Sequence, residues 1–530
     1  MTEQATQAQQ RSELHKTIWS IADDLRGSVD GWDFKQYVLG ILFYRFISEI
    51  LCDYLNEVEP DPDFDYSSLS DEEAEFGRSA TVKEKGFFIL PSELFRNVRA
   101  SVMQGAPNRE EALEHLNETL EQAFRNIEGS AIGEESEKDL KGLFDDMDVN
   151  SAKLGNTVTD RNKKLAKLLE KIGTLDFGGE FKENRIDAFG DAYEYLMNMY
   201  ASNAGKSGGE FFTPQDVSEL LARITLVNRD STDVKRVYDP CCGSGSLLLK
   251  FSKILGSKAD IDYFGQEINL TTYNLCRINM FLHDINFDKF DIALGDTLKE
   301  PAHWDDEPFD AIVSNPPYSI KWEGKSNPLN INDPRFSPAG VLAPESKADL
   351  AFTMHMLSWL ETAATAAIVE FPGVLYRGGA EGKIRKYLVS NNFIEAIIQL
   401  PKEMFFGTSI ATCIIVLRKS KVTNDVLFID ASEEFVREGT KNTFKEEHIK
   451  KILGVLERRE EVEHFSKLVF NDDIIENDVN LSVSSYVEKE DLREKIDIHE
   501  LNAEIEQIVA REQELREKID AIVADLEGEI

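Results

Sequence analysis

A predicted buried strand ends in an amide that is well placed to bind a planar amine. Residues 309–318 read Phe-Asp-Ala-Ile-Val-Ser-Asn-Pro-Pro-Tyr. Ile312 and Val313 favour a strand, and the two prolines end it because neither can donate a hydrogen bond to a sheet. Asn315 therefore lies at a strand end on a stiff backbone, with the ring of Tyr318 close behind it. The arrangement favours binding of a planar group that carries an amino function.

A glycine-rich turn after an earlier predicted strand indicates a second ligand site. Residues 239–246 read Asp-Pro-Cys-Cys-Gly-Ser-Gly-Ser, and we expect a helix over residues 247–255. Gly243 and Gly245 allow a tight turn and close approach of a ligand, and the first N–H groups of the helix point at that ligand. The turn lacks the GK[ST] sequence of a Walker loop. Asp239 is unsuited to a pyrophosphate and suits a positively charged amino acid group, as in S-adenosylmethionine.

Two more carboxylates end the next two predicted strands. Glu267 ends the first of them and is placed to accept bonds from both hydroxyls of a ribose. Asp296 ends the second and is placed to accept a bond from an adenine amino group. A single glycine-rich turn is often only a tight connection. Three acidic strand ends in succession, followed by Asn-Pro-Pro-Tyr, favour a nucleoside-bearing cofactor over loop carboxylates placed by chance.

The elements that position these residues alternate between strand-like and helix-like segments from residue 235 to about residue 430. This alternation predicts an α/β fold, a Rossmann-like sheet with helices on both faces. Ligands bind such sheets outside the carboxyl ends of the strands, where the residues above lie. The predicted strands are residues 234–238, 263–265, 292–294, 311–313, 367–371, 394–399, 413–417 and 426–429.

Helical patterns flank this region on both sides. Before it, apolar residues recur at helical spacing and predict a bundle without chemistry of its own, or else a surface for a partner or DNA. After it, apolar residues follow a heptad pattern that needs a second helix to bury it: Ile498, Leu501, Ile505, Ile508, Leu515, Ile519, Ile522 and Leu526. We expect three domains: a helical domain over 1–175, a catalytic domain over 176–435 and a helical docking region over 436–530.

The segment just before the glycine-rich turn predicts a helix start. Thr213 suits the N-cap, Pro214 suits the first helical position, and Asp216 completes a spacing like that of a capping box. The preceding Phe211 and Phe212 either plug the core or form a wall beside a cofactor.

Residues 319–347 interrupt the α/β alternation with a long loop that contains four prolines. A loop of this length in a compact domain is more often functional than accidental. We expect a lid or a contact with nucleic acid rather than an inert insertion.

Composition argues for a reduced, cytoplasmic protein without structural metal. The 530 residues include five cysteines with no framework spacing, and the N-terminus lacks the apolar segment of a signal peptide. No apolar run is long enough to span a membrane. The formal net charge of −38 opposes DNA binding by the isolated chain, since phosphate contacts need clustered Lys and Arg. If DNA is the substrate, a partner subunit must supply positive surface.

Together these residues resemble S-adenosylmethionine-dependent amino methyltransferases, and most closely the modification subunit of type I restriction–modification systems. The block at residues 209–214, Gly-Glu-Phe-Phe-Thr-Pro, is the most specific part of the likeness. One departure is Cys241-Cys242, where small residues such as Ala are more usual. The likeness extends over the helical N-terminal region and residues 239–245, 265–267, 315–318, 349–352 and 405–409.

The resemblance implies an adenine-specific DNA methyltransferase that acts within a multisubunit complex. The implied partners are double-stranded DNA, a specificity subunit that reads the sequence and a restriction/translocase subunit, with two copies of this chain per complex. The implied cofactor is S-adenosylmethionine. The residues that would line it by this likeness are Glu210, Phe211, Phe212, Thr213, Pro214, Gln215, Ser244, Gly245, Ser246 and Glu267.

The implied catalytic group is Asn315, Pro316, Pro317 and Tyr318. The Asn315 Oδ1 atom and the Pro316 carbonyl would each accept one hydrogen of the adenine amine, which localises the nitrogen lone pair toward the methyl group. Transfer is then a direct displacement that depends on positioning and electrostatics. The base must leave the duplex, and stacking on the Tyr318 ring offsets part of that cost. Stacking needs the ring rather than the hydroxyl.

Two alternatives remain open from the sequence. Protein glutamine-amide methyltransferases also use Asn-Pro-Pro-Tyr, but those enzymes are smaller and do not need the long helical flanks. A non-catalytic assembly subunit would keep the fold, but the intact motif and the acidic strand ends argue against it.

Overall fold

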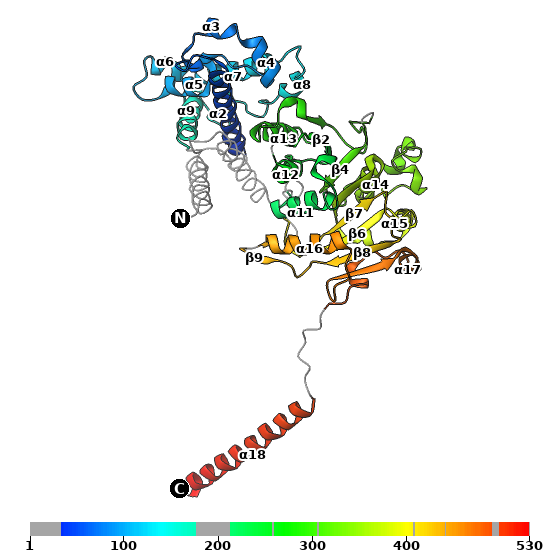
Figure 1. Cartoon of the computed structure of the whole chain (residues 1–530). Coiled ribbons are helices and arrows are strands. Elements are labelled where there is room, and N and C mark those ends of the chain that lie inside the picture. Colours follow the sequence, from blue (N-terminus) through cyan, green and yellow to red (C-terminus); the bar gives the residue numbers. More distant parts are fainter. Residues whose placement is uncertain are drawn as a thin grey trace. The chain divides into compact units, whose positions relative to one another are not determined.

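The computed structural model describes residues 33–175, 213–256, 259–304, 307–405, 409–439, 441–489 and 498–528 (Figure 1). By its internal contacts the chain divides into two units, residues 1–487 and 488–530. Part of the helical region predicted before the sheet, residues 1–32 and 176–212, lies outside the described residues. The predicted limits of the three domains remain a prediction.

A nine-stranded sheet forms the centre of the first unit, in the order β11-β8-β6-β7-β5-β4-β1-β2-β3. β7 and β11 run antiparallel to their neighbours, and all the other pairings are parallel. The strands are β1 (Arg236–Asp239), β2 (Asp262–Glu267), β3 (Phe290–Leu294), β4 (Phe309–Ser314), β5 (Leu360–Glu370), β6 (Ile394–Gln399), β7 (Cys413–Arg418), β8 (Asp425–Asp430) and β11 (Ser466–Phe470).

All eight predicted strands are present, so the prediction of an α/β sheet is confirmed. The prediction that the last hundred residues are helical is wrong in two places. β11 lies at the sheet edge, and a short hairpin joins β9 (Val436–Glu438) to β10 (Lys441–Thr443). β11 buries only Ser466 and Val469, so its apolar alternation is too weak to read from the sequence.

Helices cover both faces of the sheet because successive strand residues point to opposite sides. Val237, Ala311 and Val313 belong to one buried cluster, whereas their neighbours Tyr238 and Ile312 belong to the other. On the first face lie α11 (Gln215–Thr225), α12 (Ser246–Leu255), α13 (Leu270–Leu282) and α16 (Glu446–Arg458). On the second lie α14 (Asp349–Trp359), α15 (Gly379–Ser390) and α17 (Asn471–Glu476).

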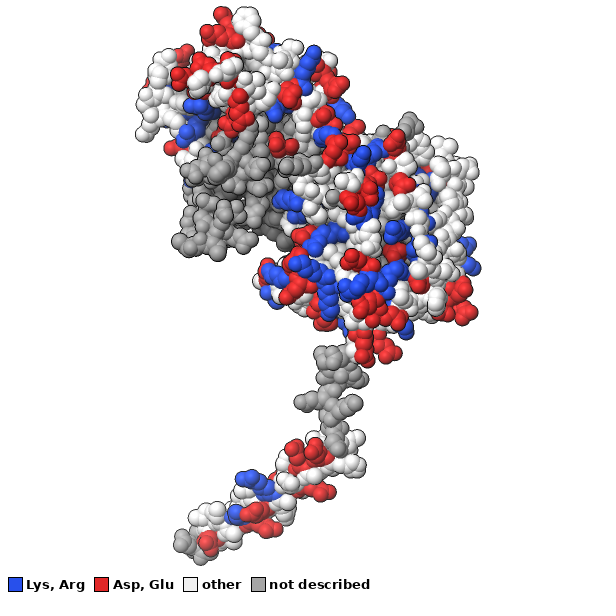
Figure 2. Space-filling view, viewed as in Figure 1, with Lys and Arg blue, Asp and Glu red and all other residues white. Residues whose placement is uncertain are grey.

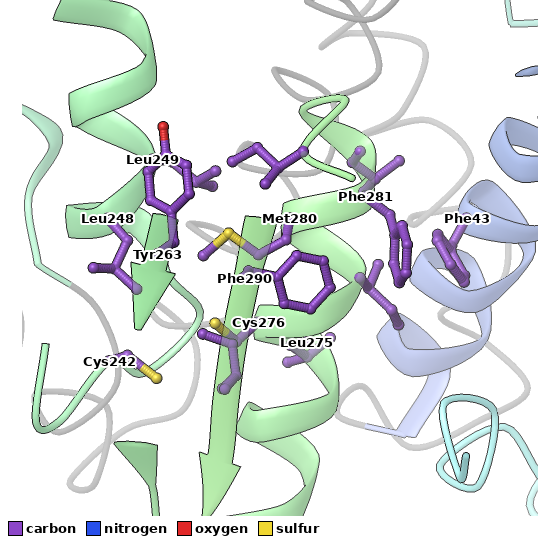
Figure 3. Packing of buried hydrophobic residues seen from close by; sticks show 14 of the residues in the cluster. Phe43, Cys242, Leu248, Leu249, Tyr263, Leu275, Cys276, Met280, Phe281 and Phe290 are labelled. Carbon is purple, nitrogen blue, oxygen red and sulfur yellow. The ribbon is translucent and has the colours of Figure 1, made fainter. Parts of the chain in front are cut away.

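The described part of the N-terminal region is helical, as predicted. Its helices are α2 (Asp33–Val58), α3 (Asp71–Glu75), α4 (Arg78–Lys85), α5 (Phe95–Val102), α6 (Arg109–Glu114), α7 (Leu116–Gly129), α8 (Glu137–Leu140) and α9 (Val158–Gly173). This region packs on α13: the rings of Phe43 and Phe281 lie 6.4 Å apart (Figure 3). The buried Arg277 guanidinium donates to the carbonyls of Lys138, Asp139 and Lys141.

The second unit holds one long helix, α18 (Ile498–Gly528). All of its side chains described over residues 498–526 are exposed, including every apolar residue of the predicted heptad pattern. An exposed apolar stripe of this length is unfavourable in water. Among the described helices, none is both long and apolar enough to cross a bilayer.

Candidate active site

The parallel strands β1 and β4 lie side by side and bring the two predicted motifs together. Tyr238 is in register with Ile312, so the carboxyl ends of both strands lie at the same edge of the sheet. There the Ser314 hydroxyl donates to Asp239 Oδ1 over 2.9 Å. Asn315 follows directly. The sequence predicted this edge as the site, and the geometry places the acidic strand end next to the amide.

Asp239 is a buried carboxylate with one free oxygen. Its Oδ1 atom also accepts from the Cys241 N–H, but its Oδ2 atom has no hydrogen-bond partner among the described residues. Burial raises the pKa of Asp239 to about 7, and the charge of Glu267 adds to that rise. A buried acceptor of this kind is stabilised by a cationic donor. The residue therefore fits an ammonium group of a bound ligand.

The glycine-rich turn adopts a backbone that glycine allows. Gly243 and Gly245 have φ values of 55° and 82°, and a Cβ atom at Gly245 would lie only 2.9 Å from the Cys276 sulfur. The turn ends at Ser246, the first residue of α12, and both Ser244 and Ser246 are buried. Figure 3 shows the packed layer of α12 and α13 side chains beside Cys242. Glycine at position 245 is therefore required by the left-handed backbone and by the close packing against α13.

Glu267, at the end of β2, is tied to the same turn. Its Oε2 atom accepts from the Gly243 N–H over 3.1 Å and its Oε1 atom from the Asn269 N–H over 2.8 Å. Burial raises the pKa of Glu267, and these backbone donors oppose that rise. Each carboxylate oxygen keeps further acceptor capacity, so the prediction that Glu267 binds a ribose stays open.

Asp296 follows β3 and lies close to Glu267. Its Oδ1 atom accepts from the Leu298 N–H over 2.9 Å, and the Gly295 N–H donates to the Glu267 carbonyl. Two apolar side chains that the sequence analysis did not single out are exposed here: Ile268 by 67% and Leu294 by 49%. Both lie directly beside an acidic strand end, and this position in the sequence could have drawn attention to them.

The Asn315 amide is held at both ends by hydroxyl groups. Its Nδ2 atom donates to Thr213 Oγ1 over 3.0 Å, and its Oδ1 atom accepts from the Tyr318 hydroxyl over 2.6 Å. The sequence analysis predicted only that the Tyr318 ring stacks on a base, and it assigned no role to the hydroxyl. Burial raises the pKa of Tyr318 well above its ordinary value, with the charge of Glu370 as a second cause. The hydroxyl therefore stays protonated and donates.

The turn that follows Tyr318 is fixed by a buried carboxylate. Ser319 has a φ of 53°, in the left-handed region, and its N–H donates to Asp349 Oδ1 over 2.9 Å. On the other side, the Tyr318 ring lies edge-on to Phe405 with the centroids 6.5 Å apart. Asp349 belongs to the Asp-Leu-Ala-Phe block named in the resemblance, and its contact with the turn explains why that block lies near the motif.

Glu370, the last residue of β5, is a second buried acid near this turn that the sequence analysis missed. Its Oε1 atom accepts from the Thr353 hydroxyl over 3.0 Å, while Glu370 Oε2 and Asp349 Oδ2 lack partners among the described residues. Burial raises the pKa of Glu370 well above its ordinary value, and the charge of Asp349 adds to this. Burial therefore disfavours the charged form of Glu370.

The predicted start of α11 is wrong by one residue. The helix begins at Gln215, with Pro214 as its N-cap. Thr213 does not cap it, because its hydroxyl binds Asn315 instead. Asp216 does not complete a capping box either, since its Oδ2 atom accepts from the Phe444 N–H. The side-chain amide of Gln215 is buried without a partner among the described residues, which also fits a polar ligand.

Several predicted residues lie outside the part of the chain that the structure describes. Glu210, Phe211 and Phe212 are among them, as are residues 406–408. Within the described ranges, no group of three or more His, Cys, Asp or Glu residues is arranged to hold a metal ion.

The long loop at residues 319–347 is anchored beside Asp296. The buried guanidinium of Arg335 donates to the carbonyls of Thr297 and Leu298, each over 2.8 Å, and pairs with Asp333. The loop contains three short 3-10 turns, η6 (Gly324–Ser326), η7 (Pro328–Ile331) and η8 (Ser337–Ala339), and η8 packs against α15. Its predicted role as a lid or nucleic-acid contact stays a prediction.

This edge of the sheet can bind two ligands next to each other. Asp239, Gln215, Glu267 and Asp296 offer acceptors for an amino acid and a nucleoside, and Ile268 and Leu294 offer apolar contact to a ring. Asn315 presents an amide oxygen at the adjacent strand end. The arrangement suits group transfer from a cationic cofactor to an amine.

Two families match this chain over most of its length. Residues 184–495 match the N-6 DNA methylase family, and residues 14–172 match the HsdM N-terminal domain. The chain is 49% identical to the type I restriction enzyme MpnII methylase subunit of Mycoplasma pneumoniae, with 98% of this chain and 97% of that protein covered. It is 32% identical to the MjaVII methylase subunit of Methanocaldococcus jannaschii over 70% of this chain and 67% of that protein.

A solved structure of similar fold agrees with these sequence matches. It is a type I restriction-modification system methyltransferase subunit from Streptococcus thermophilus, with a TM-score of 0.80 and 36% identity. The alignment covers 90% of this chain and all (100%) of the other.

Proposed function

Because this chain belongs to the N-6 DNA methylase family and matches the methylase subunits of type I restriction–modification systems, we propose that the edge formed by β1, β2 and β4 is its active site. The chain is an adenine-specific DNA methyltransferase. The reaction moves a methyl group to the N6 amine of adenine. We infer a cytoplasmic location, because the enzyme must meet its DNA substrate.

The cofactor assigned to this edge is S-adenosylmethionine, which supplies a methyl group on a sulfonium ion. Asp239 Oδ2 would hold its ammonium group, because this buried oxygen has no other partner. Glu267 would bind the ribose hydroxyls and Asp296 the adenine amine. Ile268 and Leu294 would cover the adenine ring. Thr213, Pro214 and Gln215 lie at the start of α11, on the side of Asn315.

The target amine would lie against Asn315 and Pro316. Asn315 Oδ1 and the Pro316 carbonyl each accept one of its hydrogens, so its nitrogen lone pair turns toward the methyl group. The bound cofactor would supply the methyl group: the new N–C bond would form as the S–C bond breaks and leaves a thioether, and the surplus proton of the amine would pass to solvent water. A base inside a duplex cannot reach this edge, so the adenine must be extruded at a cost of a few kcal/mol. The Tyr318 ring would stack on it and return about 1–3 kcal/mol.

The charge distribution supports DNA binding near the motif despite the overall acidity. Residues 319–347 and 371–390 together carry eight Lys or Arg against four Asp or Glu, whereas the whole chain has 59 against 97. Lys321 and Lys325 on the loop and Lys383 and Lys386 on α15 are exposed. None of these four pairs with a described acidic residue. We infer that they contact phosphates that flank the extruded base.

A second group of basic residues, near α16, lies among acidic residues and forms ion pairs with them. Figure 2 shows Lys and Arg gathered where Figure 1 places α16, with Asp and Glu among them. Lys451 pairs with Glu434 and Arg223 with Glu446 in this area. That face is therefore a weaker candidate for DNA than the loop and α15.

The partners we assign are a specificity subunit, which would bring most of the positive surface, and a restriction/translocase subunit. Two copies of this chain would serve one complex. The exposed heptad stripe of α18 is the docking surface we assign to the specificity subunit, since a single helix cannot bury such a stripe.

The observation that carries this proposal is the contact from Ser314 to Asp239, which joins the cofactor strand to the catalytic strand. The test is methyl transfer from labelled S-adenosylmethionine to duplex DNA and to protein, with and without a co-expressed specificity subunit. Label on adenine N6 that requires the partner supports the proposal. Label on protein glutamine favours the alternative activity, and no label on either supports a purely structural subunit.

A further inference from the structure

An asparagine amide has two ends of nearly equal shape but opposite hydrogen-bonding character. Only the oxygen end can accept a hydrogen from the target amine, while the nitrogen end would face it donor to donor. A catalytic asparagine therefore needs neighbours that fix its orientation. In this chain two hydroxyl groups are these neighbours. Asn315 Nδ2 donates to Thr213 Oγ1 over 3.0 Å, and the Tyr318 hydroxyl donates to Asn315 Oδ1 over 2.6 Å.

We propose that Thr213 is a positioning residue for methyl transfer, which holds Asn315 Nδ2 and so presents Asn315 Oδ1 to the target amine. This inference rests on the proposed function of Asn315. In this role Thr213 orients the residue that binds the target amine. The resemblance implies only that Thr213 lines the cofactor.

Thr213 is suited to this task because its backbone is fixed. The residue is 5% exposed and precedes Pro214, the N-cap of α11. That helix packs on β4 and β5. Its first turn is tied to the Phe444 backbone through Asp216, over 2.6 Å. The hydroxyl thus reaches Asn315 from a rigid element 102 positions earlier in the chain.

The contact from Thr213 also strengthens the acceptor. When an amide donates through its nitrogen, its oxygen becomes more electron-rich, because linked hydrogen bonds polarise one another. The Tyr318 hydroxyl occupies one lone pair of Asn315 Oδ1 and leaves the second for the amine. If the amide were reversed, the Tyr318 proton would lose this acceptor.

The decisive substitution is Thr213→Val, which keeps the shape and removes the hydroxyl. A neutral hydrogen bond of this kind corresponds to roughly a 3- to 10-fold fall in kcat. The fall in kcat should exceed any change in the Kd for S-adenosylmethionine, since the bond lost lies on Asn315. Thr213→Ser retains the hydroxyl and should restore kcat. Thr213→Ala serves as a second hydroxyl-free variant if Val perturbs folding.

Thr225→Val is the matched control, because Thr225 is also a buried threonine, it is the last residue of α11, and its hydroxyl donates to the Ala222 carbonyl instead of Asn315. All variants are assayed in complex with the specificity subunit on duplex DNA. A kcat for Thr213→Val and Thr213→Ala that equals that of Thr225→Val overturns the proposal. So does a loss found wholly in cofactor Kd. If the wild-type complex itself transfers no methyl group to DNA, the proposed function fails instead.

Discussion

Cofactor affinity should depend on pH through Asp239. Its pKa of about 7 arises from burial and the nearby charge of Glu267, and only the ionised form attracts an ammonium group. A carboxyl with this pKa is about nine-tenths ionised at pH 8 and about one-tenth at pH 6. Because apparent affinity scales with the competent fraction, the Kd for S-adenosylmethionine should rise about ninefold from pH 8 to pH 6.

The Kd rises toward acid pH because the pKa of Asp239 is raised in the free protein. The free protein holds the proton below pH 7, and the bound cation lowers the pKa of Asp239, so binding must release that proton in acid. Asp239→Asn removes the charge and keeps the acceptor for the Ser314 and Cys241 donors. Loss of a charge-assisted hydrogen bond costs about 1.5–3 kcal/mol, or roughly 10- to 150-fold in Kd at pH 8. At pH 6 the same substitution should cost far less.

Calorimetric titration at pH 6, 7 and 8, in two buffers with different ionisation heats, measures both affinity and proton release. Glu267→Gln is the comparison variant, since it removes the neighbouring charge and should lower the midpoint of the pH profile. A wild-type Kd that stays constant from pH 6 to pH 8 would refute the reasoning. An equal pH dependence in Asp239→Asn would assign the titration to another group.

Three further outcomes are expected. Tyr318→Phe should lower kcat about 3- to 10-fold, because the hydroxyl that holds Asn315 is lost. Tyr318→Ala should lower kcat further, because the ring that stacks on the base is lost too. Equal kcat values for the two variants would contradict this. The double variant Lys383→Glu/Lys386→Glu should weaken DNA binding and leave the cofactor Kd unchanged. The slope of log affinity against log salt concentration should fall by the equivalent of about two phosphate contacts. A slope equal to that of wild type would show that these lysines do not contact DNA. Leu515→Asp in α18 should abolish co-purification with the specificity subunit without changing cofactor affinity, and full retention of the complex would rule out the stripe as the docking surface.

The strands and the meeting of Asp239 with Asn315 were predictable because both depend on local pattern. Runs of Val and Ile predict strands, and the ends of parallel strands share one edge of a sheet. Contacts between distant side chains were not predictable. The bond from Thr213 to Asn315 depends on how α11 packs on β4, and the same residue reads locally as a helix cap. The bond from Ser319 to Asp349 likewise depends on tertiary position.

The sequence patterns also failed to predict the strand at the edge of the sheet. β11 has few buried residues because only one of its sides pairs with the sheet, so packing rather than propensity places it beside β8. The buried acid Glu370 was also missed, since one carboxylate in an apolar strand carries no pattern of its own.

The most direct test of the central claim is methyl transfer by Asn315→Ala in complex with the specificity subunit. With labelled S-adenosylmethionine and duplex DNA, the wild-type complex should place label on adenine N6, and the variant should place none while it binds cofactor with nearly the wild-type Kd. Transfer by the variant at the wild-type rate would contradict the role of Asn315 and the site built around it.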